Sequence, residues 1–123
     1  MKIPAQRITF ILAILWTSLS VFLLLSPSAH IPEVGISFPG MDKLIHVVVF
    51  FIFALLWTLS LGAKRNTALL VLFLGITFSS ATELLQINIA GRSRDIYDWY
   101  ANCLGVFTGV LFALLFTRNA KKC

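Results

Sequence analysis

Four long stretches without Asp, Glu, Lys or Arg dominate the sequence, at residues 8–25, 44–62, 67–82 and 99–117. A helix needs about 20 predominantly apolar residues to cross a bilayer, and the first, second and fourth stretches have this length. The third reaches it if the helix continues through Glu83 to about residue 89, which places a carboxylate inside the span. We therefore predict an all-α integral membrane protein, a single domain of residues 1–123 with transmembrane helices at about 8–25, 44–62, 67–89 and 96–117.

Composition and charge support this prediction. The chain is 59% hydrophobic and 12% charged, whereas soluble domains carry about 25% charged residues. Its net charge of +5 comes from short basic clusters that flank the apolar stretches, as in membrane proteins that follow the positive-inside rule. Nucleic-acid binding is not expected, because it requires Lys and Arg side chains along one face or groove, with aromatic residues between them.

The distribution of charge also predicts an orientation. With both termini in the cytoplasm, the inner segments hold seven of the ten Lys and Arg residues and none of the five acids. The reverse orientation would place these seven basic residues outside, against the positive-inside rule. The first stretch has the basic start of a signal peptide, but it exceeds the usual hydrophobic core of about 7–15 residues. We expect it to be retained as a helix of a multi-pass protein of the cytoplasmic (inner) membrane.

In this orientation, the outer ends of three helices carry nearly all the strongly polar side chains. They are Asp42, Lys43 and His46 on the second helix, Glu83 and Gln86 on the third, Arg92 and Arg94 in the following loop, and Asp95, Asp98 and Asn102 on the fourth. Spacings of three or four residues place the members of each helical group on one face. Gly105 and Gly109 form a G-x-x-x-G step that allows close helix packing. An ionisable side chain within a span indicates a functional site by default.

The same residues also have structural explanations. Asp95 is suited to cap the fourth helix, with Asp98 in the first turn near the positive end of the helix dipole. Asn102 is suited to interhelical hydrogen bonding. Glu83 has a structural alternative as the partner of Arg92 in a buried ion pair. An interfacial aromatic belt would account for Tyr97, Trp99 and Tyr100.

The polar motifs, taken together, resemble the VanZ-like family. They are Asp42-Lys43-Leu44-Ile45-His46, then Glu83-Leu84-Leu85-Gln86, then Gly91-Arg92 followed by Asp95, Asp98, Asn102 and Gly105. The resemblance covers about residues 42–113. It implies a multi-pass membrane protein of the bacterial cell envelope. The family takes its name from a protein linked to teicoplanin resistance, which supplies a phenotype but no reaction.

The leading hypothesis is a protein that binds or modifies an envelope lipid or a lipid-linked glycan at its outer face. The candidate catalytic residues are His46, Glu83 and Asp98, with Glu83 or His46 as general acid or base. The candidate substrate-binding residues are Asp42, Lys43, Gln86, Arg92, Arg94, Asp95 and Asn102, with the arginines holding a phosphate or carboxylate.

Two other interpretations fit the same side chains. In the first, the polar cluster is structural and the protein is a non-catalytic accessory or assembly factor. In the second, His46, Glu83 and Asp98 bind a metal ion. The sequence contains no H-x-x-x-H motif or cysteine ligand set, so neither a metal nor another cofactor is expected.

Overall fold

The computed structural model describes residues 4–27, 35, 38–92 and 94–122, and all regular structure in these residues is α-helical. The helices are α1 (Ala5–Leu25), α2 (Met41–Leu61), α3 (Arg65–Gln86) and α4 (Ile96–Ala120). Each is long and apolar enough to cross a membrane, which confirms the predicted fold class. Helix α3 ends at Gln86, before the predicted residue 89, and a turn with Gly91 at a φ of 76° leads towards α4.

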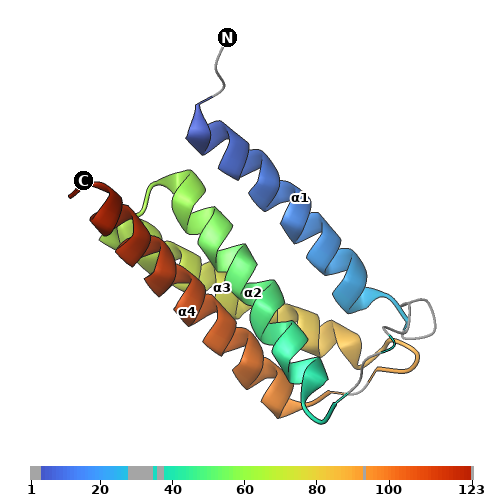
Figure 1. Cartoon of the computed structure of the whole chain (residues 1–123). Coiled ribbons are helices and arrows are strands. Elements are labelled where there is room, and N and C mark those ends of the chain that lie inside the picture. Colours follow the sequence, from blue (N-terminus) through green and yellow to red (C-terminus); the bar gives the residue numbers. More distant parts are fainter. Residues whose placement is uncertain (1–3, 28–34, 36–37, 93, 123) are drawn as a thin grey trace.

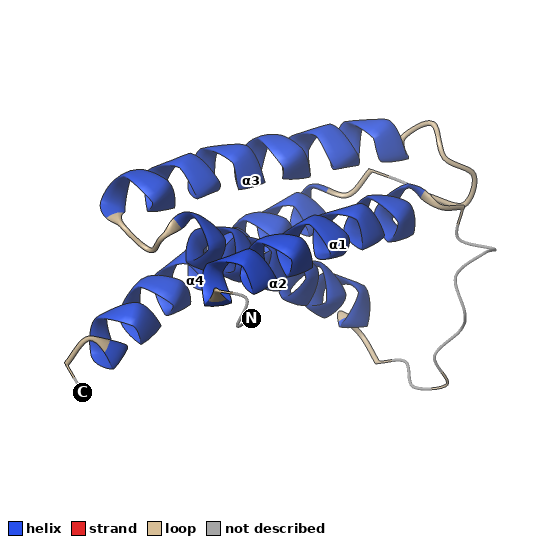
Figure 2. Cartoon of the chain, turned by 90° about the horizontal axis from the view of Figure 1, so that it is seen from above, coloured by secondary structure: helices blue, strands red, loops and turns tan. Residues whose placement is uncertain are grey.

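The helices run alternately up and down, so that both termini lie at one end of the bundle (Figure 1). Helix α2 packs against α1 on one side and α4 on the other, and α3 contacts α4, α2 and α1. Viewed from above, α3 lies along one side of the bundle (Figure 2). The start of α2, the end of α3 and the start of α4 therefore meet at the end opposite the termini. That this end faces outwards remains a prediction from the charge distribution.

The glycine step in α4 determines how closely α4 approaches α2. A Cβ atom at Gly105 would collide with the carbonyl oxygen of Val47, and one at Gly109 with that of Phe51. The two helices thus pack backbone against backbone, as predicted from the G-x-x-x-G spacing. Because Asn102 lies one turn before Gly105, this crossing holds its side chain against α2.

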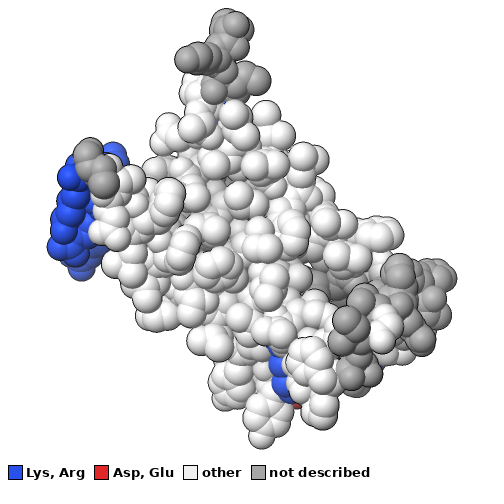
Figure 3. Space-filling view, viewed as in Figure 1, with Lys and Arg blue, Asp and Glu red and all other residues white. Residues whose placement is uncertain are grey.

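The outer surface of the bundle is strongly apolar. Large hydrophobic side chains are exposed on all four helices, including Phe22 on α1, Phe73 on α3 and Phe107 on α4. On the face drawn in Figure 3, the middle of the molecule shows no charge, and basic side chains gather beside the C-terminal end. This surface is suited to contact with lipid chains, while the polar groups turn inwards at one end of the bundle.

Candidate functional site

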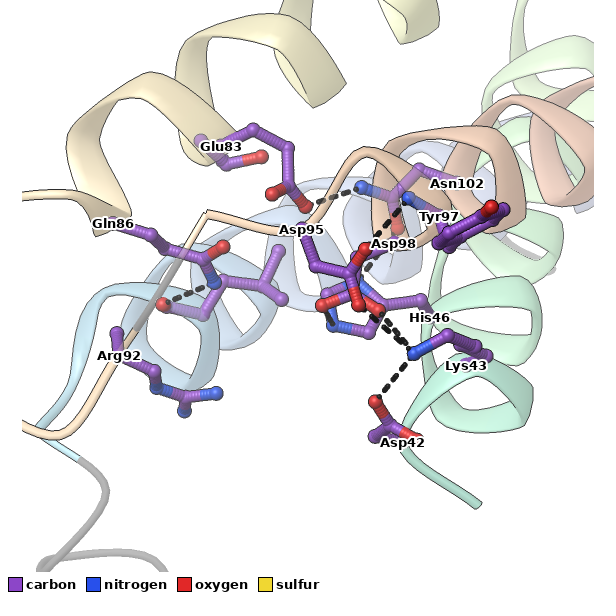
Figure 4. A network of polar contacts seen from close by, with 12 residues as sticks. Asp42, Lys43, His46, Glu83, Gln86, Arg92, Asp95, Tyr97, Asp98 and Asn102 are labelled. Carbon is purple, nitrogen blue, oxygen red and sulfur yellow. Dashed lines mark hydrogen bonds and ion pairs between the residues drawn. The ribbon is translucent and has the colours of Figure 1, made fainter. Parts of the chain in front are cut away.

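Lys43 joins the starts of α2 and α4. Its Nζ lies 3.0 Å from Asp42 Oδ2, 3.1 Å from Asp95 Oδ2 and 3.3 Å from Asp98 Oδ1. Asp95 also caps α4, because its Oδ1 accepts the Tyr97 backbone N–H at 2.9 Å. The Tyr97 N–H and the Lys43 ammonium together lower the pKa of Asp95. The predicted capping role of Asp95 is confirmed, and the same carboxylate is part of a network that spans two helices (Figure 4).

Asn102 links α4 to both α2 and α3. Its side chain is fully buried; its Oδ1 lies 2.7 Å from His46 Nδ1, and its Nδ2 donates to Glu83 Oε1 at 3.2 Å. This orientation of the amide is consistent with the chemistry of its neighbours. The Asn102 NH₂ donates to a carboxylate oxygen of Glu83, and the Asn102 carbonyl is left to accept from the His46 Nδ1–H.

A second set of polar atoms converges beside this amide. Glu83 and His46 are only 4% and 6% exposed, and Asp98 Oδ2 lies 3.8 Å from His46 Nε2. Potential ligand atoms of the three residues all lie within 4.8 Å of one another. Glu83 Oε2 is buried and has no hydrogen-bond partner among the described residues. Figure 4 shows the Glu83 carboxylate directed towards Asn102 and the Asp98–His46 pair. The three predicted catalytic residues therefore do lie together.

Gln86 and Arg92 bind the end of α1. Gln86 Nε2 donates to the Leu24 carbonyl at 2.9 Å, and Arg92 donates to the carbonyls of Leu23 at 3.0 Å and Ser26 at 3.3 Å. The last carbonyls of a helix have no partner within the helix, and a cation is favoured at this negative end of the helix dipole. The predicted alternative of a Glu83–Arg92 ion pair is therefore wrong. The predicted substrate-binding role of Gln86 and Arg92 is untested, but in this structure both donate to α1.

A pocket of about 290 Å³ opens between α3 and α4 beside Glu83. Its lining combines polar and apolar side chains: Ser80, Glu83, Leu84, Arg94, Asp95, Ile96 and Trp99. Trp99 donates from Nε1 to Ser80 Oγ at 3.0 Å, which fixes one wall. A second pocket, of about 230 Å³, lies on the α1 side of the cluster and is lined in part by Asp42, His46 and Arg92. The cluster thus borders two pockets.

Three features of this site were not predicted from the sequence. Lys43 was expected to bind substrate, whereas its ammonium joins three carboxylates. Ser80 had no predicted role, and Trp99, expected in an interfacial belt, donates to it. Tyr97 and Tyr100, expected in the same belt, are exposed. Helix α1 was expected to belong to no site, although the unpaired carbonyls at any helix C-terminus provide acceptors for donors such as Gln86 and Arg92.

The chain matches a protein-family model and a curated relative. The sequence model of the family described as VanZ/LLP1 matches residues 4–117, so the match includes the first helix and the loop that follows it. An uncharacterized protein of Schizosaccharomyces pombe, C11E3.10, is 31% identical over 83 residues, which cover 66% of this chain and 51% of the relative. The chain thus spans about half the length of that relative. No solved structure matches. The family match over nearly the whole chain shows that this protein belongs to the VanZ/LLP1 family.

Proposed function

We propose that the protein binds the headgroup of a membrane lipid in the pocket between α3 and α4. The observation that carries this proposal is the lining of that pocket, where charged groups and lipid-facing apolar side chains border the same cavity. Glu83 lies in its buried part, while Leu84 and Ile96 are exposed on the outer surface of α3 and α4. A headgroup can therefore enter sideways from the bilayer while its acyl chains stay in the lipid.

The charges of the pocket define the headgroup that fits. Arg94 offers guanidinium donors, which match a phosphate well. Glu83 and Asp95 offer carboxylate acceptors, which need hydroxyl or ammonium donors. The complementary ligand carries a phosphate together with hydroxyl or amino groups, as do phospholipids with such headgroups and lipid-linked glycans. A headgroup without donors would leave the buried carboxylate without a partner, which is costly.

The S. pombe relative bears on the choice between these ligands. A relative in a eukaryote favours a ligand common to bacterial and eukaryotic membranes over one found only in bacterial envelopes. We therefore place phospholipids first and lipid-linked glycans second. If the ligand is a lipid-linked glycan of a bacterial envelope, deletion of the protein should change susceptibility to glycopeptide antibiotics, as the family's name suggests.

Binding can be tested on the purified full chain with short-chain lipids that dissolve as monomers. Dihexanoyl phosphatidylethanolamine and dihexanoyl phosphatidylcholine share a phosphate and a net charge, but the choline headgroup lacks N–H donors. We expect ethanolamine lipid to raise the melting temperature at lower concentrations than choline lipid. The Arg94→Gln variant should bind the ethanolamine lipid about 10–100-fold more weakly, because it loses a charge-assisted hydrogen bond of about 1.5–3 kcal/mol.

Arg118→Gln provides the matched control, since Arg118 is an exposed arginine in the last turn of α4, at the other end of the bundle. Its lipid affinity should equal that of the wild type. Equal affinities for the two lipids, or an unchanged affinity in Arg94→Gln, would contradict the proposed pocket. Failure to bind either lipid would favour the alternative of an accessory protein, in which Gln86 and Arg92 serve to hold α1 in place.

A further inference from the structure

Potential ligand atoms of His46, Glu83 and Asp98 lie within 4.8 Å of one another in the polar cluster. Glu83 Oε2 has no hydrogen-bond partner among the described residues. His46 Nδ1 lies 2.7 Å from the Asn102 carbonyl oxygen, so in the neutral ring the proton is on Nδ1 and the lone pair is on Nε2. His46 Nε2 lies 3.8 Å from Asp98 Oδ2. Lone pairs that converge in a buried place require a proton or a cation between them.

The surrounding charges also point to a cation. Asp42, Asp95 and Asp98 share the single ammonium group of Lys43, and no salt bridge to Glu83 is found among the described residues. Arg92 donates to carbonyls at the end of α1. Glu83 is buried and the Asp98 side chain is only 14% exposed, and uncompensated negative charge in a buried place is costly.

The arrangement around His46 is that of a metal ligand with its usual support. Histidines that bind metals almost always donate their second ring N–H to a carbonyl or carboxylate, which fixes the tautomer and the orientation of the ring. Asn102 Oδ1 provides this acceptor at 2.7 Å from Nδ1, while its amide group also holds Glu83 Oε1 at 3.2 Å. One buried side chain thus orients two of the three converging residues.

We propose that His46, Glu83 and Asp98 form a binding site for a divalent metal ion, with Asn102 positioning the first two. Their ligand atoms lie within 4.8 Å of one another, and small rotations of the side chains would bring them to the ligand distances of about 2.0–2.2 Å that are usual for zinc. One imidazole and two carboxylates suit zinc or manganese. The histidine makes magnesium and calcium less suitable, because these ions prefer oxygen ligands.

Three protein ligands would leave at least one coordination position for another group. Glu83 borders the pocket between α3 and α4, so a lipid phosphate bound there could occupy this position and neutralise the remaining charge. This role of the ion rests on the proposed lipid-binding function, whereas the metal site itself does not.

The test uses the full chain without a histidine tag, stripped with EDTA and then dialysed against buffered zinc. We expect elemental analysis to find about one zinc ion per chain, and zinc to raise the melting temperature of the stripped protein. Asp98→Asn and His46→Gln should each bind zinc at least about tenfold more weakly. A stripped wild type that binds no zinc or manganese and gains no stability from either would overturn the proposal.

Asp42→Asn is the matched control, because it makes the same change to a carboxylate of the same network outside the three converging residues. Asp42 is exposed and contacts Lys43, and its removal should weaken zinc binding far less than Asp98→Asn does. Equal zinc binding in Asp98→Asn and Asp42→Asn would show non-specific binding and overturn the site. Circular dichroism of each variant would distinguish loss of the site from loss of the fold, and the wild-type zinc measurement decides the matter if a variant does not fold.

Lipid binding, measured on the same samples, separates this proposal from the proposed function. Zinc binding without lipid binding would support the metal site but contradict the proposal that a lipid phosphate binds the metal ion. Lipid binding that depends on Arg94, in a protein that binds neither metal, would overturn the metal site and leave the proposed function intact.

Discussion

Replacing Asn102 with leucine should destabilise the bundle sharply. Asn102 is fully buried and makes two side-chain hydrogen bonds, one with His46 and one with Glu83. Leucine has the same number and branching of side-chain heavy atoms, so the main effect is that the His46 N–H and the Glu83 carboxylate lose their partners. An orphaned buried polar group costs about 1–3 kcal/mol. Interhelical hydrogen bonds in membranes average about 0.6 kcal/mol, so we expect a total loss of about 2–4 kcal/mol.

A triple variant, His46→Leu, Glu83→Met and Asn102→Leu, should recover most of this loss. Replacing all partners of a buried polar network with apolar groups of similar volume is often neutral, or stabilising by about 1–4 kcal/mol. Recovery would indicate that the polar residues are maintained for function and that the fold does not require them. Asp98 keeps its contact with Lys43 in this variant, so no new unpaired carboxylate is created there.

The assay is reversible unfolding by SDS in mixed micelles containing EDTA, followed by tryptophan fluorescence and circular dichroism. Asn88→Leu, which changes an exposed asparagine, should stay within about 0.5 kcal/mol of the wild type. A single Asn102→Leu variant as stable as this control would refute the hydrogen-bond network. A triple variant no more stable than the single variant would show that the polar cluster stabilises the fold.

Three further outcomes test the packing and the orientation. Gly105→Leu should destabilise the protein by at least about 1–3 kcal/mol in the same SDS assay, because any Cβ at this position collides with the Val47 carbonyl of α2. A variant as stable as the wild type would contradict the close packing of α2 and α4. Arg92→Gln should remove the hydrogen bonds to the end of α1 and so speed amide hydrogen exchange at Leu25. Unchanged exchange at Leu25 would show that Arg92 does not stabilise the end of α1. In intact cells, a membrane-impermeant maleimide should label a cysteine placed at Asn88 but not Cys123, and the opposite result would invert the predicted orientation.

The end of the bundle at which the polar residues meet could be predicted, because the alternating directions of the helices determine it. Four helices that alternate in direction bring the start of α2, the end of α3 and the start of α4 to one end, whatever their rotation. The glycine spacing of Gly105 and Gly109 likewise predicted a close helix contact, and the structure confirms it with α2 as the partner. These features follow from chain direction and residue size alone.

The pairings within the site could not be predicted, because they depend on the rotation of each helix and on competing acceptors. Glu83 and Arg92 carry opposite charges and lie close in sequence, but the unpaired carbonyls at the end of α1 bind the arginine instead. The expectation that no metal binds rested on the absence of ligand spacing within one segment. His46, Glu83 and Asp98 come from three different helices, so no such spacing could have indicated their convergence.

Native mass spectrometry of the protein, released from gently solubilised membranes, tests the lipid-binding claim most directly. The wild type should retain a lipid whose mass identifies a headgroup with a phosphate and hydroxyl or amino donors. Glu83→Gln, which keeps the shape of the side chain but removes its charge, should lose this lipid while circular dichroism shows an unchanged helical fold. A wild type that retains no such lipid, or a Glu83→Gln variant that retains the same lipid to the same extent, would contradict the account.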